Sequence, residues 1–401
     1  MLKCRECGEE YPPTKIYACD HCFGPLEVVY NLDSVKLDRN SFKKRPNTLW
    51  RYHELLPAED KTKIVDLGAG FTILRECRRL GKALGLRKLY VKDDTINPTG
   101  SFKDRPATVA VSKALEFGFK AVGCASTGNL AAATAAHAAK AGIPCYVFIP
   151  SNTEINKILQ AATYGAEIIA VKGTYDEANR LAAQASDEYE WALVNINIRP
   201  YYAEGSKTLA FETCEQLGWR TPDNIIIPMG SGALLCAVWR GLKQFRDLGL
   251  IDELKTKVIG AQPQGCSPIV SAFKSNSGEV IPVEEPKTIA KSLAIGDPGD
   301  GIYALKIIQE SGGIAESATD EEIIEGIKIL AKTEGIFAEP AGGVAIAVLK
   351  NLIKSGEIPK DEEVVCCVTG SGFKSSETIL ESVPKPVEIE PSLEELKKII
   401  R

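Results

Sequence analysis

The sequence predicts an α/β protein with two open-sheet domains, preceded by a small cysteine-rich segment. From about residue 50 onward, short β-branched runs alternate with alanine-rich helical stretches. Strands that are buried on both faces and alternate with helices are typical of a mostly parallel sheet. These units are too many for one sheet of ordinary size, so we expect two sheets. The first 30 residues differ, because they hold four cysteines and few apolar side chains.

Length and composition are those of an ordinary globular protein. The chain has 401 residues, of which 44% are hydrophobic and 25% charged, enough for a large core. A net charge of -5 argues against a nucleic-acid-binding surface. No apolar run approaches the roughly 20 residues of a membrane span, and the N-terminus has no apolar stretch typical of a secretory signal. The cysteines outside the first segment lie mostly in apolar surroundings, as reduced thiols do. We therefore expect a cytoplasmic protein with no nucleic-acid and no membrane partner.

The four N-terminal cysteines have the spacing of a zinc site. Cys4 and Cys7 form one C-x2-C pair, Cys19 and Cys22 form another, and 11 residues separate the pairs. This spacing suits four thiolates on one tetrahedral zinc, a structural site that we expect to be remote from catalysis. So small a segment needs such a staple to fold. Two disulfides, four free thiols, iron in place of zinc, and His21 as a substitute ligand are the alternatives.

The remaining elements follow from the β-branched runs and the helical stretches between them. The predicted strands cover residues 88–92, 121–125, 145–149, 167–171, 224–227, 257–260 and 363–368. The predicted helices cover residues 106–116, 130–141, 175–186, 233–248, 320–334 and 342–355. Residues 391–396 have the pattern of a capped terminal helix outside the main sheets.

One lysine follows the strand at residues 88–92, at a turn from strand to helix. Lys103 lies in Asn-Pro-Thr-Gly-Ser-Phe-Lys-Asp-Arg, residues 97–105, whose Asn-Pro and Thr-Gly dipeptides are typical of turns. In open α/β sheets, ligands bind where the strands end. Lys103, between Asp104 and Arg105, is therefore a candidate for a Schiff base with an aldehyde cofactor. The alternative is a solvated lysine at the start of a helix.

Three further strand ends carry hydroxyl groups and glycines. Ser-Thr-Gly-Asn at residues 126–129 opens a helix, where free backbone amides favour an anion, although helix capping alone also explains these residues. Met-Gly-Ser-Gly-Ala-Leu at residues 229–234 has glycines that let several amides converge on one phosphate. Thr369, in Thr-Gly-Ser-Gly, can hydrogen-bond a ring nitrogen. For both of these loops the alternative is a plain glycine-rich turn.

The segment 195–205 is unusually polar for one that follows a strand. Arg199 within it can hold a phosphate or carboxylate in a forked geometry, and a surface salt bridge is the alternative. A lysine, a phosphate cradle, a ring-nitrogen partner and a second anion site together match pyridoxal 5'-phosphate and an anionic amino-acid substrate.

These motifs resemble those of the threonine synthases, within the fold-type II pyridoxal-phosphate enzymes (the tryptophan synthase β family). The resemblance extends from the cysteine-rich start to about Lys374 and includes residues 201–207 and 333–339. It implies two open-sheet α/β domains of that fold, preceded by a zinc ribbon. The implied domains are a zinc ribbon at 1–30, a large domain at 31–105 and 205–385, a small α/β domain at 106–204, and a C-terminal helix or tail at 386–401.

The resemblance also implies a role for each motif. Lys103 is the Schiff-base residue, Asn129 hydrogen-bonds the phenolic oxygen of pyridoxal 5'-phosphate, and Thr369 faces its pyridine nitrogen. The residues implied to hold the cofactor phosphate are Gly230, Ser231, Gly232, Ala233 and Leu234. The residues implied to bind the substrate are Ser126, Thr127, Asn195, Asn197 and Arg199.

The implied reaction converts O-phospho-L-homoserine and water to L-threonine and phosphate by γ-elimination and β-addition. Alternatives on the same scaffold are cysteate synthase, which acts on O-phosphoserine, and threonine dehydratase. An alternative of another class is a zinc-ribbon protein whose enzyme-like body only binds ligands. The expected partners are a phosphorylated amino-acid substrate and a second copy of the chain in a homodimer. The chain departs from the family pattern at Ala69, Ile73 and Ser371, and we expect these positions near the substrate.

Overall fold

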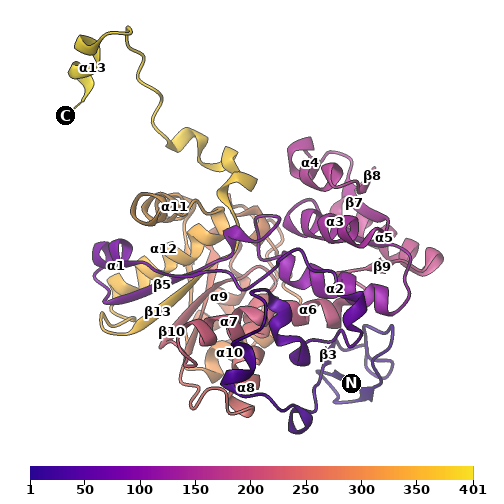
Figure 1. The fold of residues 1–401 in the computed structure, drawn as a ribbon. Coiled ribbons are helices and arrows are strands. Elements are labelled where there is room, and N and C mark those ends of the chain that lie inside the picture. The colour runs from indigo at the N-terminus through magenta and orange to yellow at the C-terminus, as the bar shows by residue number, and fades with distance from the viewer. Residues whose placement is uncertain (401) are drawn as a thin grey trace.

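The structure, a computed structural model that describes residues 1–400, contains three sheets (Figure 1). A six-stranded sheet has the order β12-β11-β10-β13-β5-β4, and a four-stranded sheet has the order β8-β7-β6-β9. A three-stranded sheet near the N-terminus has the order β2-β1-β3. The prediction of two open α/β sheets behind a small N-terminal segment is therefore confirmed.

The six-stranded sheet forms the larger core. Its strands are parallel, except that β4 pairs antiparallel with β5. Ile225 and Ile227 face one layer of helices and Ile226 faces the other, as alternation along a strand requires. Every residue of β10 and β13 is buried, which explains their continuous apolar runs. The strands are β4 (Leu74–Glu76), β5 (Lys88–Asp93), β10 (Asn224–Pro228), β11 (Lys257–Pro263), β12 (Ala315–Ala318) and β13 (Glu363–Val368).

Helices cover both faces of this sheet. The helices on one face are α7 (Thr208–Gln216), α8 (Ala233–Asp247), α9 (Pro268–Ser275) and α10 (Gly301–Glu310). The helices on the other face are α1 (Arg78–Leu84), α11 (Asp320–Glu334) and α12 (Pro340–Ser355). The bounds of α11 are the same as those predicted from the sequence, because residues at both ends cap the helix. Thr319 accepts a hydrogen bond from the Glu322 amide at 3.2 Å, and Gly335 ends the helix with a φ of 70°.

The four-stranded sheet is parallel throughout. Its strands are β6 (Val122–Ala125), β7 (Cys145–Pro150), β8 (Glu167–Val171) and β9 (Ala192–Leu193). Its helices are α2 (Asp104–Glu116), α3 (Asn129–Ala141), α4 (Ile155–Thr163), α5 (Tyr175–Tyr189) and α6 (Arg199–Ser206). Helices α2 and α6 are in close contact because Gly205 has no side chain, since a Cβ there would overlap the backbone of Arg105.

The N-terminal ribbon, residues 1–30, packs against α6. Leu2, Leu26 and Val28 share a core with Tyr201, whose hydroxyl donates a hydrogen bond of 2.7 Å to the Thr14 carbonyl. The strands of the ribbon are β1 (Leu2–Cys4), β2 (Glu10–Tyr11) and β3 (Leu26–Val28). In Figure 1 the ribbon lies near α2 and α6, whereas α13 (Leu393–Ile399) stands away from the body at the end of the C-terminal tail.

Short 3₁₀ helices complete the structure. They are η1 (Leu32–Ser34), η2 (Arg39–Phe42), η3 (Leu49–Leu55), η4 (Lys61–Lys63), η5 (Asp94–Ile96), η6 (Gln264–Cys266), η7 (Lys291–Leu293), η8 (Gly372–Lys374) and η9 (Ser376–Ser382). Within residues 1–400, no helix has both the length and the apolar character that crossing a membrane requires.

Candidate active site

A cavity of about 1140 Å³ lies where strands of the two large sheets end. Strand β13 lies between β10 and β5, so the loops that follow these three parallel strands meet at one edge of the six-stranded sheet. The loop after β6 contributes the facing wall from the four-stranded sheet. The predicted site residues that line this cavity are Lys103, Ser126, Thr127, Asn129, Arg199, Gly230, Ser231, Gly232, Ala233, Leu234 and Thr369.

The backbone fixes Lys103 beside Thr369. The Phe102 amide donates to the Thr369 carbonyl at 2.8 Å, and the Ser371 amide donates to the Gly100 carbonyl at 2.8 Å. Lys103 itself is the N-cap residue of α2 and lines the cavity, with its Nζ atom 4.6 Å from the centre of the Phe102 ring. The lysine is therefore held by main-chain bonds at the junction of two strand ends, in agreement with the turn predicted for residues 97–105.

Asp104 and Arg105 do not flank Lys103 in the cavity, because both side chains are fully buried. Asp104 accepts hydrogen bonds from the amide of Thr99 at 2.8 Å and from its hydroxyl at 3.0 Å. Burial raises the pKa of Asp104 to about 6, and the hydrogen bonds from Thr99 oppose this shift. The aspartate thus closes the turn before Lys103, and neither of the two charged residues beside Lys103 in the sequence lines the cavity.

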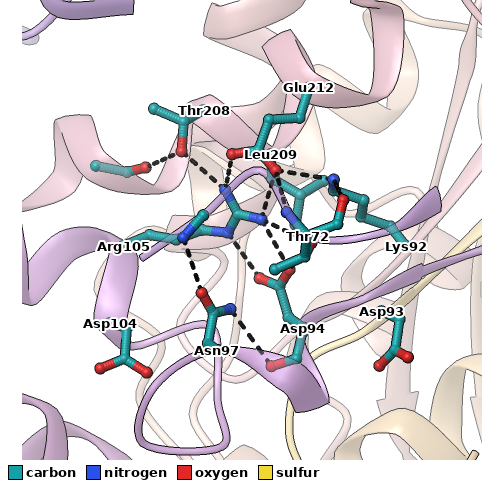
Figure 2. Close-up of polar contacts among 12 residues, drawn as sticks. Thr72, Lys92, Asp93, Asp94, Asn97, Asp104, Arg105, Thr208, Leu209 and Glu212 are labelled. Atoms are coloured by element: carbon teal, nitrogen blue, oxygen red, sulfur yellow. Dashed lines mark hydrogen bonds and ion pairs between the residues drawn. The ribbon is translucent and has the colours of Figure 1, made fainter. Parts of the chain in front are cut away.

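Arg105 occupies the centre of a buried ionic cluster under this turn (Figure 2). Its guanidinium donates to Asp94 at 2.7 and 2.8 Å and to Glu212 at 2.5 and 2.8 Å. Further bonds reach the hydroxyls of Thr208 at 3.0 Å and Thr72 at 3.1 Å. These contacts tie the start of α2 to η5 and α7, so they anchor the segment that carries Lys103.

The charges of this cluster balance. Lys92 lies 2.8 Å from Glu212, so two cations face two carboxylates in a region from which water is excluded. Burial by itself would raise the pKa of Glu212, but Arg105 and Lys92 lower it, to about 2. Lys92 is therefore engaged in the interior, whereas Lys103 lines the cavity.

The glycine loop before α8 is shaped to receive an anion. Gly232 has a φ of 90°, and a Cβ there would lie 2.9 Å from the Ala304 side chain and 3.0 Å from the Asp300 carbonyl. The amides of the first helical turn have no carbonyl partner inside the helix, and this end of α8 lines the cavity. The loop fits the phosphate group of pyridoxal 5'-phosphate, since the positive end of α8 and its free amides face the cavity.

Asn129 contacts a carboxylate that the sequence interpretation gave no role. Its amide nitrogen donates to both oxygens of Glu339, at 3.2 and 3.0 Å. Burial raises the pKa of Glu339, while the hydrogen bond from Asn129 and the charges of Lys374 and Lys103 oppose this shift. Glu339 lines the cavity, and a Cβ on Gly370 would overlap its carboxylate. The sequence could have indicated Glu339, because it is the single acidic residue in Ile-Phe-Ala-Glu-Pro, just before a predicted helix.

Lys374 is a second lysine in the cavity wall that sequence reasoning missed. Its Nζ donates to the Thr99 carbonyl at 2.8 Å and to Gln160 Oε1 at 2.5 Å. Burial lowers the pKa of Lys374, and the nearby carboxylates of Glu339 and Asp104 oppose this shift. The lysine therefore bridges the loop after β13 to α4 of the four-stranded sheet.

The three residues predicted from segment 195–205 have different fates. Arg199 lines the cavity, and its Nη2 atom lies 2.6 Å from Asp300 Oδ2. Asn197 is not among the lining residues: it accepts from the Leu193 amide at 2.8 Å and donates to Ser186 Oγ at 2.7 Å and to the Trp191 carbonyl at 2.8 Å.

Asn195 also lies outside the cavity lining. Its side-chain oxygen is buried without a hydrogen-bond partner in the described part of the chain. The cavity lining gives no support to a substrate contact for either asparagine, and the side-chain amide of Asn197 bonds instead to the backbone around β9.

The four N-terminal cysteines come together as predicted. Their sulfur atoms all lie within 4.8 Å of one another, and the closest distances are 3.4 Å between Cys4 and Cys22 and 3.6 Å between Cys7 and Cys19. Four sulfurs at 2.3 Å from a tetrahedral zinc would be about 3.8 Å apart, so this geometry fits the metal. The glycine at position 24 is also required by this arrangement, because a Cβ there would lie only 2.9 Å from the Cys4 sulfur.

The ribbon is not remote from the cavity, which corrects the sequence-based expectation. Arg5, Tyr17, Phe23 and Glu27 are among the ribbon residues that line the cavity. The spacing of the cysteines predicted that the four sulfur atoms cluster, but it held no information on where the folded ribbon would dock.

The three departures from the family pattern do not line the cavity, although Ser371 lies between Thr369 and Phe373, which do. Ala69, Ile73 and Ser371 are not among its lining residues. Instead, Ala69 and Ile73 flank the Gly70–Thr72 stretch, where Gly70 lies close to Glu212 and Arg105. The expectation that all three positions lie near the substrate is therefore not met by the structure.

Comparisons with known proteins give a consistent result. A family model described as "Pyridoxal-phosphate dependent enzyme" matches residues 65–370. The threonine synthase of Methanocaldococcus jannaschii is 44% identical over 100% of this chain and 99% of its own length, and that of Methanosarcina acetivorans is 41% identical over 100% and 98%. Among solved structures, the processed form of threonine deaminase isoform 2 from Solanum lycopersicum superposes with a TM-score of 0.67 at 23% identity, covering 83% of this chain and 94% of that one.

Proposed function

We infer that this chain, which belongs to the family of pyridoxal-phosphate dependent enzymes, is a threonine synthase that converts O-phospho-L-homoserine and water to L-threonine and phosphate. The observation that carries this function is the similarity to threonine synthases along the whole chain. The cavity supports it, because a glycine loop for one phosphate and a separate arginine for another open on the same space as Lys103.

Pyridoxal 5'-phosphate is the cofactor of this enzyme, and we propose that Lys103 binds its aldehyde carbon. The amides of the 230–234 loop would hold its phosphate, and Thr369 and Asn129 would contact its ring. When bound, this cofactor supplies an acceptor for the negative charge that develops at the substrate Cα. The neutral hydroxyl of Thr369 would not force the ring nitrogen to be protonated, which would suit elimination and replacement better than transamination.

The residues of the chain would then divide the proton and phosphate chemistry. Once the amine of the substrate has replaced Lys103 at the aldehyde carbon, the freed Lys103 amine would take the proton from Cα of the substrate. A Cβ proton would be lost next, and phosphate would leave from Cγ. Arg199, with the hydroxyls of Ser126 and Thr127, holds the phosphate that leaves. A proton would then return to Cγ to form the methyl group, water would add at Cβ, and a proton would return to Cα to give L-threonine.

We further propose that Cys4, Cys7, Cys19 and Cys22 hold one structural zinc. Four thiolates leave no open coordination position for chemistry, and the sulfur positions fit a tetrahedral ion. Metal analysis of the purified protein tests this assignment. An equimolar zinc content supports it, and iron or no metal contradicts it.

The remaining parts of the interpretation are also proposals. We propose a homodimer, a cytoplasmic location, and the division into residues 1–30, 31–105 with 205–385, 106–204, and 386–401. The division is supported by sheet membership, since β6 to β9 all lie within 106–204. Sedimentation analysis tests the dimer, and limited proteolysis followed by mass analysis of the fragments tests the boundaries.

The function is tested by offering the purified holoenzyme three substrates. We expect phosphate and L-threonine in equal amounts from O-phospho-L-homoserine, and little product from O-phosphoserine with sulfite or from L-threonine. Preferential formation of cysteate would show a cysteate synthase, and release of ammonia from L-threonine would show a dehydratase. Cofactor absorbance without turnover of any of the three would leave a protein that only binds ligands.

A further inference from the structure

Three charged residues from distant parts of the chain meet at the wall of the cavity. Arg5 comes from the N-terminal ribbon, Arg199 begins α6, and Asp300 precedes α10. Arg5 Nη1 donates to Asp300 Oδ1 at 2.8 Å, and Arg199 Nη2 donates to Asp300 Oδ2 at 2.6 Å. One carboxylate is therefore shared by two guanidinium groups, and all three residues line the cavity.

The position of Asp300 places this triad next to the glycine loop. The Asp300 amide donates to the Ser231 carbonyl at 3.0 Å, and its own carbonyl lies against Gly232. Its carboxylate nevertheless points toward the two arginines rather than to the loop amides. An anion bound by the arginines would thus lie beside the cofactor phosphate but in a separate position.

The ion pairs that connect to this triad contain one more cation than carboxylate, and the Glu6 carboxylate lies nearby, where it accepts a hydrogen bond from Tyr303. Glu27 lies 3.9 Å from Arg5 Nε and 3.2 Å from Arg240, so it is shared as well. Arg240 also meets Glu204, which pairs with Lys207. Across this network Arg5, Arg199, Arg240 and Lys207 give four positive charges, and Asp300, Glu27 and Glu204 give three negative charges.

If the contact served only to dock the ribbon, one arginine paired with one carboxylate would be enough. Here Arg5 is also held by a cation–π contact, because its guanidinium lies 3.5 Å from the centre of the Tyr303 ring. Its side chain is 15% exposed and that of Asp300 is 7% exposed, whereas Arg199 is 45% exposed. Arg5 is therefore the pre-oriented member of the pair and Arg199 the more accessible one.

We propose that Arg5 of the ribbon is a substrate-binding residue that, with Arg199, forms a two-arginine receptor for the phosphate of the substrate. In the free enzyme Asp300 fills this receptor as an internal anion, and a phosphate dianion displaces it by offering more charge and more acceptor oxygens. An amino acid without a phosphate cannot displace Asp300. This inference rests on the proposed function and names how that same site selects a phosphorylated substrate.

Substitutions at Arg5 and Asp300 have opposite expected effects on phosphate binding. In Arg5→Ala one donor is lost and Asp300 pairs with Arg199 alone, so we expect the dissociation constant of inorganic phosphate and the KM for O-phospho-L-homoserine to rise about 10- to 100-fold. Arg5→Lys should recover part of this loss, since it keeps the charge but not the fork. In Asp300→Asn the competing anion is gone, so inorganic phosphate should bind about tenfold more tightly.

The experiment titrates inorganic phosphate into the holoenzyme by calorimetry and measures turnover of O-phospho-L-homoserine beside cofactor absorbance. Lys3→Ala is the matched control, because Lys3 lies in the same ribbon and pairs with Glu10 at 3.3 Å outside the cavity lining. Opposite shifts in the Arg5 and Asp300 variants, with unchanged cofactor content and an unchanged control, support the receptor.

Three results would overturn the inference while leaving the proposed function intact. The first is weaker phosphate binding in both variants, which would mean that the triad only docks the ribbon. The second is loss of cofactor in Arg5→Ala, which would assign the arginines to the cofactor phosphate. The third is an unchanged phosphate affinity in Arg5→Ala while the parent turns over O-phospho-L-homoserine. A parent that binds phosphate with the expected shifts but does not turn over this substrate would instead refute the proposed function.

Discussion

Replacing Arg105 with methionine tests whether the buried cluster supports the turn that carries Lys103. Methionine is unbranched and fills much of the same space, so the main change is the loss of the guanidinium. In the parent this group contacts Asp94 and Glu212 with two hydrogen bonds each and also reaches Thr72 and Thr208.

The expected cost follows from what the substitution leaves behind. Asp94 keeps the hydroxyl of Thr72 at 2.7 Å, and Glu212 keeps Lys92 at 2.8 Å, but one of two buried negative charges has no cation. Breaking a buried ion pair by removing one partner typically costs about 3–5 kcal/mol. Because native proteins are stable by about 5–15 kcal/mol, this is a large share of the total.

Urea unfolding of the holoenzyme, followed by circular dichroism, measures this cost. With a slope of about 3 kcal/mol per M, the midpoint should fall by about 1–1.7 M. Arg78→Met is the control, because Arg78 is 81% exposed and pairs with Glu76 at the surface, where such a pair contributes about 0–1 kcal/mol. Equal midpoints for the two variants would refute the view that the cluster holds the fold at this point.

Three further predictions concern the cofactor, the metal and pH. Borohydride reduction followed by peptide mapping should place a pyridoxyl group on Lys103, and a label on another lysine would contradict the assignment. In Cys4→Ser/Cys7→Ser the zinc content should fall, and the KM for O-phospho-L-homoserine should rise because the ribbon walls the cavity; a full zinc content or an unchanged KM would count against this. The pKa of Glu212 is lowered to about 2 from an ordinary value of 4.5, so its contribution to stability is complete above about pH 4.5 and is lost as the pH falls toward about 2. Urea midpoints between pH 7 and pH 3 should therefore fall less steeply for Glu212→Gln than for the parent.

The fold could be predicted largely because its strands are buried on both faces. The predicted strand at 363–368 matches β13 residue for residue, and all of its residues are buried. The predicted strand at 167–171 matches β8 as well, although β8 is an edge strand with no fully buried residue. Strand β9 was missed because two residues, Ala192–Leu193, carry no periodic signal. Strand β4 was missed because its residues are not fully buried, with the pattern Leu-Arg-Glu.

Some residues of the site could be predicted from the local sequence, whereas others depend on how distant segments pack. Lys103, Thr369 and the loop 229–234 were found because each lies at the end of a recognisable strand. Glu339, Lys374 and Asp300 were missed because their place in the cavity depends on how separate segments pack. Asn197 was misplaced for the opposite reason: a polar residue after a strand suggested a ligand, but its amide completes the backbone bonds around β9.

The docking of the ribbon has a consequence for how the polypeptide matures on the ribosome. Arg5 emerges before its partner Asp300, which follows 295 positions later. At about 5–20 residues per second, that interval is roughly 15–60 s. During this time Arg5 has no Asp300 to pair with, although α6, against which the ribbon packs, has already been synthesised. The ribbon can thus pack on α6 before its ion pair with Asp300 forms.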